Sequence, residues 1–165
     1  WTALMFTCSK GHDQCLLELL KAGAAVDHAA ADGVASLMLA ARNNHEGCLL
    51  ALLKAGADPD KARDDGWTAL MDACDCSHEQ CARALIKAGA AVDKRGPRDV
   101  TALIIACKNG HEQCALALIE AWANLESKTA RGSTALIIAC KNGHEQCASA
   151  LLKAGAAVDA TEEEG

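Results

Sequence analysis

The segment Thr-Ala-Leu-Ile-Ile-Ala-Cys-Lys-Asn-Gly-His-Glu-Gln-Cys-Ala runs from Thr101 to Ala115 and occurs again, unchanged, from Thr134 to Ala148. The two copies are 33 residues apart, and looser copies precede them at the same spacing. A leucine, a histidine and a cysteine recur in all five units. These residues are Leu4, Leu37, Leu70, Leu103 and Leu136; His12, His45, His78, His111 and His144; and Cys15, Cys48, Cys81, Cys114 and Cys147. A fixed period of this size without insertions predicts a stacked array of one supersecondary unit.

Each unit has the pattern of two short helices joined by a tight corner. In unit three, Thr68 is placed to cap a first helix over 69–76, and the second helix is expected over 79–87. The array should therefore contain five helix pairs. We expect helices near 2–10 and 13–22 and at every 33 residues after that.

Small and polar residues mark the ends of the second helices. Ser77 and Gln80 have the spacing of a capping box. Gly89 is placed to end the same helix in a left-handed conformation, and glycine recurs there in three other units. Unit four has Trp122 instead. This tryptophan either accepts the left-handed conformation, at a cost of about 1–2 kcal/mol, or ends the helix differently, and we expect its ring to cover apolar surface or to anchor a partner.

The pattern resembles the ankyrin repeats, whose unit has 33 residues and the signature Thr-Pro-Leu-His-x-Ala. This chain has Thr68-Ala-Leu-Met-Asp-Ala73 in unit three, Gly110-His111 at the corner of unit four, and Leu52-Leu-Lys-Ala-Gly-Ala57 at the end of the second helix of unit two. The resemblance implies an all-α repeat solenoid, in which β-turn fingers join helix-turn-helix pairs into a right-angled array with a concave groove. We expect one domain over 1–165. Its repeats are expected at about 1–32, 33–65, 66–98, 99–131 and 132–165.

The chain departs from the family signature in every unit. Alanine or serine replaces the proline, and methionine or isoleucine replaces the histidine. In the family, that histidine makes a hydrogen bond between neighbouring repeats, so an apolar contact must replace it here. The first unit lacks its finger, and Leu4 and Phe6 do not resemble the polar cap of a solenoid end. We therefore expect a segment of a longer array, followed by a solvated acidic extension over 161–165.

Nine of the ten cysteines occupy two recurring positions. Five share the position of Cys15, and four share that of Cys8, where unit two has Ala41. A position that accepts either cysteine or alanine is small, buried and apolar. We therefore expect reduced thiols and no disulfide framework, which indicates the cytoplasm or the nucleus.

The densest group of possible zinc ligands is Cys74, Cys76, His78 and Cys81. All but Cys76 fill recurring positions, which favours packing over metal binding. The recurring histidines are expected to bond backbone groups left open by the corner. The sequence has no Gly-rich phosphate loop and no Ser-His-Asp pattern. It predicts no catalytic residue, no cofactor and no metal, so we expect a protein that is not an enzyme.

Composition excludes several classes of partner. The net charge of −6 argues against unaided binding to nucleic acid or to an anionic membrane surface. No apolar run approaches the roughly 18 residues that span a bilayer. The resemblance implies a protein partner, and we expect the chain to bind it as a monomer.

Residues that differ between units are the candidates for recognition. The resemblance implies that partners contact the finger tips and the exposed positions of the first helices, and basic residues gather there in the C-terminal half. The predicted site consists of Trp67, Arg95, Arg98, Lys108, Arg131 and Lys141. We expect it to bind an acidic peptide or domain face, with Trp67 as the apolar anchor. The alternatives are ordinary surface variation and, for Trp67, a ring lying flat across the neighbouring finger.

The favoured function is a non-catalytic scaffold for protein–protein interaction. One alternative is a targeting or regulatory segment of a larger enzyme or channel, with the chemistry elsewhere. Another is a designed or consensus-like array without a native partner. The identical segments favour design or recent copying, whereas Asp72, Trp122 and Arg95-Gly-Pro-Arg98 are unlike a designer's choices.

Overall fold

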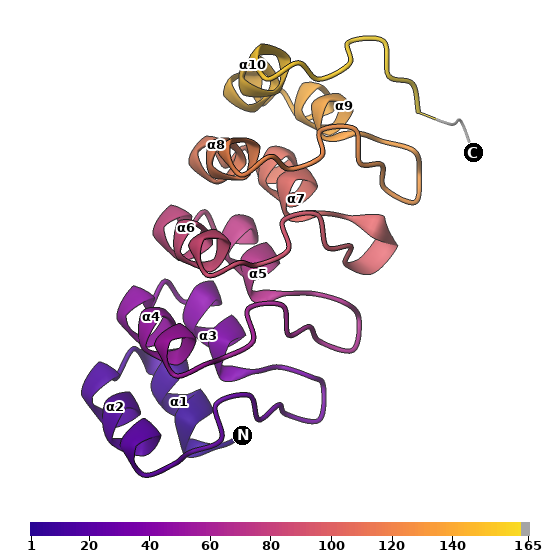
Figure 1. Ribbon diagram of the computed structural model, residues 1–165. Coiled ribbons are helices and arrows are strands. Elements are labelled where there is room, and N and C mark those ends of the chain that lie inside the picture. Colours follow the sequence, from indigo (N-terminus) through magenta and orange to yellow (C-terminus); the bar gives the residue numbers. More distant parts are fainter. Residues whose placement is uncertain (163–165) are drawn as a thin grey trace.

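The computed structural model describes residues 1–162, which contain ten α-helices in five pairs (Figure 1). The first helices of the pairs are α1 (Ala3–Lys10), α3 (Ser36–Arg42), α5 (Ala69–Asp75), α7 (Ala102–Asn109) and α9 (Ala135–Lys141). The second helices are α2 (Asp13–Lys21), α4 (Glu46–Lys54), α6 (Glu79–Lys87), α8 (Glu112–Glu120) and α10 (Glu145–Lys153). A 3-10 helix, η1 (Pro97–Asp99), lies between α6 and α7. The helices expected from the period are confirmed.

The pairs stack in chain order. Each first helix packs on the next first helix, from α1 to α9, and the second helices form a parallel layer beside them. The loops that join the pairs project from the opposite side (Figure 1). Two of these loops are closed by isolated bridges, Ala29 with Ala35 and Ala62 with Thr68. This arrangement confirms an all-α solenoid with fingers on one side.

Threonine side chains start four of the five first helices. In each case the hydroxyl oxygen accepts a hydrogen bond from the backbone N–H three residues later, which satisfies one of the open donors of the first turn. These residues are Thr2, Thr68, Thr101 and Thr134. Unit two has Ala35 there and makes no such bond. The cap predicted at Thr68 is therefore confirmed.

The second helices begin differently, and the predicted capping box of Ser77 and Gln80 is wrong. The residue before the helix is His78, which makes no side-chain capping bond. Ser77 lies one residue further out, with φ at 62°. The corner needs a left-handed residue there, and the equivalent Gly110 and Gly143 supply it in other units. The turn geometry thus removes Ser77 from the capping position.

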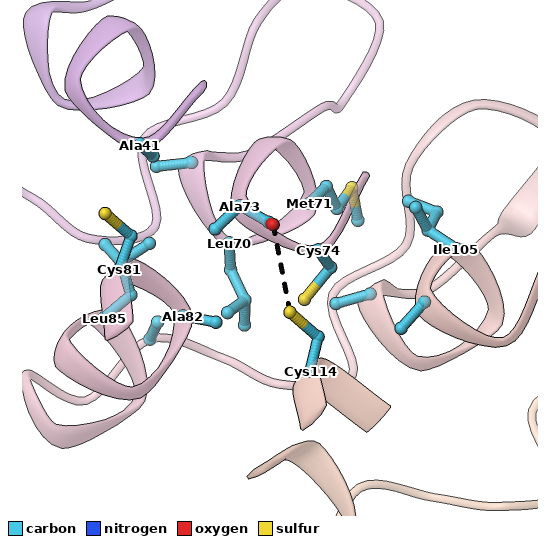
Figure 2. Packing of buried hydrophobic residues seen from close by; sticks show 14 of the residues in the cluster. Ala41, Leu70, Met71, Ala73, Cys74, Cys81, Ala82, Leu85, Ile105 and Cys114 are labelled. Carbon is cyan, nitrogen blue, oxygen red and sulfur yellow. Dashed lines mark hydrogen bonds between the residues drawn. The ribbon is translucent and has the colours of Figure 1, made fainter. Parts of the chain in front are cut away.

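The core is a thin layer that runs through all the units. In its centre, Leu70 and Cys74 of α5 face Ala82 and Leu85 of α6, and Cys114 reaches in from the next pair (Figure 2). The apolar replacements for the signature histidine belong to this layer: Met5, Met38, Met71 and Ile104 are buried. The apolar contact expected at that position is therefore present.

Most of the recurring cysteines belong to the same layer. Seven of the nine are buried, whereas Cys15 and Cys140 are exposed at opposite ends of the array. Burial raises the pKa of the Cys8 and Cys81 thiols to about 11. These thiols stay protonated at neutral pH and behave as small apolar groups.

A carboxylate joins each finger to the next unit. Its oxygen accepts a hydrogen bond from a backbone N–H 31 residues later, at 2.8–3.2 Å. The four pairs are Asp27 with Asp58, Asp60 with Ala91, Asp93 with Asn124, and Glu126 with Ala157. We call this set the carboxylate ladder. It supplies one polar contact at every interface, between the turns that follow the second helices.

The corner histidines also join neighbouring units. A ring nitrogen of His78 lies 2.9 Å from the carbonyl oxygen of Ala41, and His111 and His144 reach Asp75 and Lys108 in the same way at 3.0 Å. Each ring donates to a carbonyl oxygen in the C-terminal part of the preceding first helix. The last carbonyls of a helix have no N–H partner within the helix, so they are free to accept this bond. The histidines thus bond open backbone groups as expected, and these groups belong to the preceding unit.

Trp122 ends α8 in the left-handed conformation, with φ at 62°. Its side chain is 91% exposed, so the expectation that the ring covers apolar surface is wrong. We predict that Trp122→Gly raises the free energy of unfolding by about 0.5–1 kcal/mol, because glycine removes the left-handed strain but loses more chain entropy. Urea denaturation measures this. Trp122→Ala should give no gain, and destabilisation by Trp122→Gly would show that the ring packs after all.

Candidate protein-binding surface

Two of the predicted basic residues, Arg131 and Lys141, lie near the carboxylate of Glu162. Lys141 ends α9, and Arg131 lies in the finger that precedes this helix. The carboxylate of Glu162 contacts the Lys141 ammonium and the Ser133 hydroxyl. These contacts, with Lys141 foremost, lower the pKa of Glu162, and the Arg131 charge adds to the effect. The acidic extension thus contacts the array at Glu162 instead of extending freely into solvent, and residues 163–165 lie outside the described part of the chain.

The fingers that carry Arg95 and Arg98 extend this region. The guanidinium of Arg95 donates to the carbonyl of Lys128 at 3.3 Å and lies 3.6 Å from the Asp99 carboxylate. The carbonyl of Arg98 accepts the N–H of Ala130 at 2.9 Å. The two neighbouring fingers therefore lie side by side. Asp99 offsets part of the positive charge of the two arginines. The sequence prediction did not take this acid into account, although it directly follows Arg98.

Lys108 continues the basic residues along the first helices. It occupies in α7 the position that Lys141 occupies in α9, and these helices pack together. The side chains of Arg98, Lys108 and Arg131 are exposed, and within residues 1–162 none forms an ion pair within 4 Å. The structure thus brings the five basic residues of the prediction onto adjoining elements. We call Arg95, Arg98, Lys108, Arg131 and Lys141 the basic surface.

Trp67 lies in a different environment. Its ring is half-buried, its indole N–H donates to the Asp72 carboxylate at 3.0 Å, and the Arg63 guanidinium stacks 5.3 Å from the ring centroid. Arg63 belongs to the finger just before Trp67, so the ring rests against that finger. Acidic neighbours surround it, including Asp65, which accepts its backbone N–H. The structure does not bring Trp67 together with the basic surface.

Asp72 is the residue that the site prediction missed. It fills the position of Phe6, Leu39 and Ile105, and only 3% of it is exposed. Burial raises its pKa to about 6, although Arg42, 3.5 Å away, and the Trp67 N–H act in the opposite direction. The signal was present in the sequence, because an acid stands in an apolar register. Its partners could not be predicted from the spacing.

The four possible zinc ligands do not converge. Cys74 points toward Cys114 (Figure 2), and Cys81 lies 3.7 Å from the Asn44 side chain. The His78 ring nitrogen is hydrogen-bonded to the carbonyl oxygen of Ala41. Within residues 1–162, no three side chains of His, Cys, Asp or Glu are grouped closely enough to hold a metal ion. No helix in the same range combines the length and apolarity needed to cross a membrane.

Comparison with known families agrees with the helix pairs. A family profile described as ankyrin repeats (3 copies) matches residues 1–63 and 88–162, and one described as ankyrin repeat matches residues 65–97. Domains of this kind are generally non-catalytic modules for protein interaction. A search of curated proteins finds no match to the chain. The family matches cover nearly all of its length, and the chain belongs to the ankyrin repeat family.

Proposed function

We propose that this chain is a non-catalytic scaffold that binds an acidic protein segment on its basic surface. The observation that carries the proposal is the position of Glu162. This residue is far in sequence from Ser133 and Lys141, yet its carboxylate is held by both. An ammonium and a hydroxyl that hold one carboxylate offer the same chemistry to an aspartate or glutamate of a partner. Glu162 then acts as a weak internal competitor.

The charge distribution favours the same class of partner. The chain as a whole carries −6, so an acidic protein is repelled by most of its surface. The basic surface is the place where such a partner is attracted, which orients it during encounter. Exposed ion pairs of this kind contribute little each, and their effect is screened over about 8 Å at physiological ionic strength. The binding should therefore depend strongly on salt.

Trp67 is proposed as an apolar contact at the far end of the same partner. Neighbouring first helices pack about 8–10 Å apart, so the third and fifth units are separated by about 20 Å. An extended peptide of about six residues covers that distance. A partner of this length, acidic at one end and apolar at the other, would contact both regions. We also propose that the scaffold acts as a monomer in a reducing compartment, the cytoplasm or the nucleus.

The test is a charge reversal on the basic surface. We predict that Arg98→Glu/Arg131→Glu/Lys141→Glu weakens binding of a fluorescein-labelled oligoglutamate peptide about tenfold or more, mostly through a slower association rate. These side chains are exposed and lie outside the core, so the variant should stay folded. Fluorescence polarisation at several salt concentrations measures affinity and salt dependence together.

The matched control is Lys54→Glu/Lys87→Glu/Lys153→Glu, which makes the same charge change on exposed lysines that end the second helices. It should retain most of the affinity. An equal loss in both variants would mean that only net charge matters. Unchanged affinity in the first variant would leave its basic residues as ordinary solvated surface.

A further inference from the structure

Buried thiols from neighbouring units meet in pairs inside the array. The side chains of Cys74 and Cys114 point toward one another (Figure 2), and the Cys114 sulfur also lies 4.0 Å from the carbonyl oxygen of Ala73. Cys74 is on the first helix α5, and Cys114 is on the second helix α8 of the next unit. Both side chains are buried. The two thiols therefore share one closed site at the interface between units three and four.

The same pairing recurs at two other interfaces. The hydrogen-bonded thiol pairs are Cys8 with Cys48, Cys74 with Cys114, and Cys107 with Cys147. At the interface between units two and three, Ala41 stands in the position of Cys74, so register places an alanine opposite Cys81. Three of the four interfaces thus carry two thiols in contact, and the fourth carries one.

Hydrogen bonding makes the two members of each C-terminal pair unequal. The Cys74 thiol donates to Cys114 and lowers the pKa of that thiol. The Cys107 thiol does the same for Cys147. This bond, together with burial, raises the pKa of both donors. Because the thiolate is the reactive form of cysteine, Cys114 and Cys147 are placed to attack an oxidant, and each has a second thiol beside it.

An acid holds the pair of Cys8 and Cys48 in a different state. The Cys48 thiol donates to the Asp13 carboxylate at 2.9 Å, and burial and this bond raise the pKa of Cys48. Asp13 reaches the site because the next unit has Gly47 there, where a Cβ would lie 2.4 Å from the carboxylate. The other interfaces have glutamate and glutamine at these two positions. Asp13 therefore keeps Cys48 protonated and makes this pair the least reactive.

We propose that a peroxide oxidises the two C-terminal pairs to disulfides, Cys74 with Cys114 and Cys107 with Cys147, and so fastens units three, four and five together. The oxidant reaches the buried thiols when an interface opens transiently. The attacking thiolate takes one oxygen from hydrogen peroxide and becomes a sulfenic acid, and the leaving hydroxide takes up the proton lost by the thiol.

The neighbouring thiol completes the reaction. Its sulfur attacks the sulfenic sulfur, and its proton leaves with the sulfenic hydroxyl as a second water. The two thiols together lose two electrons and two protons, and one peroxide is reduced to two waters. The units that become linked are those that carry the basic surface. Oxidation therefore fixes the positions of its elements relative to one another, while units two and three remain joined without a covalent bond.

Mass spectrometry of the full chain after peroxide treatment tests the proposal. The variant Cys15→Ser/Cys76→Ser/Cys140→Ser removes the exposed and half-exposed thiols and leaves the seven buried ones. The protein is treated with hydrogen peroxide in its folded state, quenched with catalase, and alkylated in urea. Three thiols should then remain to be alkylated, namely Cys8, Cys48 and Cys81.

Peptide mapping identifies the bonds that form. Cys74 should be joined to Cys114, and Cys107 to Cys147, at least about tenfold faster than Cys8 to Cys48. Survival of all seven thiols would overturn the proposal, and so would joined peptides from other pairs. The oxidised protein should melt about 10 °C or more above the reduced one, and dithiothreitol should reverse this gain. An unchanged melting temperature would show that the disulfides do not fasten the units.

Alanine is a suitable replacement for the neighbouring thiols, because Ala41 fills their position in unit two. Cys74→Ala/Cys107→Ala should form neither disulfide and should gain no melting temperature from peroxide. Ala41→Cys places a thiol opposite Cys81 and should add one disulfide; its failure to do so would contradict the pairing by register. Asp13→Asn should raise the oxidation rate of Cys8 with Cys48 to that of the other pairs, and an unchanged rate would show that the carboxylate does not protect Cys48.

Discussion

Replacing Asp72 with leucine will raise the free energy of unfolding at pH 7.5 by about 3 kcal/mol. The carboxyl is buried in an apolar register, and this burial raises its pKa from 3.8 to about 6. The folded protein therefore holds the proton more tightly than the unfolded chain does. Stability falls as the pH rises from about 4 to about 6, and the full cost of the buried charge remains above that range.

Urea denaturation at several pH values measures this effect. Asp72→Asn is the matched control, because it keeps an acceptor for the Trp67 N–H without a charge. The stability of the original protein relative to Asp72→Asn should improve by about 2.4 kcal/mol between pH 7.5 and pH 4, and Asp72→Leu should show no such dependence. Comparing variants cancels the titration of other acids. Parallel stability curves for all three proteins would show that Asp72 ionises without cost.

Replacing Gly110 with alanine should destabilise the protein by about 2–3 kcal/mol, whereas Gly143→Ala should cost about 1 kcal/mol. Both glycines end a first helix or lie just beyond it, with φ at 74° and 72°. A Cβ on Gly110 would lie 2.5 Å from the His144 ring, while Gly143 has nothing within 4 Å. The first substitution therefore adds a clash, and the displaced ring loses its bond to the Lys108 carbonyl.

Comparing Gly110→Ala with Gly143→Ala separates the cost of backbone strain from the cost of losing the contact between units. Both variants carry the strain of a left-handed alanine, so the difference in their unfolding free energies reports the His144 contact. In a His144→Ala background the two glycine substitutions should cost nearly the same. A difference that persists in this background would place its origin outside the histidine ring.

The period was sufficient to predict the helices, because each unit buries the same residues against its neighbours. The helix caps at Thr68 and its equivalents could also be predicted, because a cap depends on hydrogen bonds within a few residues. The role of Ser77 could not be predicted, because the geometry of the corner, and not the distance from Gln80, decides its conformation. The basic surface could be assembled from register alone. The contact of Glu162 with Lys141 and the position of Trp67 against Arg63 depend on packing between segments, which spacing does not report.

The carboxylate ladder has a mechanical consequence. Its four members join successive fingers, one at each interface, so a force that pulls the two ends apart loads these contacts in series. Because each unit is held only by its neighbours, one interface can yield while the others remain closed. Every unit of 33 residues that opens releases about 110 Å of extended chain. The array would thus lengthen in steps of one unit and recover them one at a time when the tension falls.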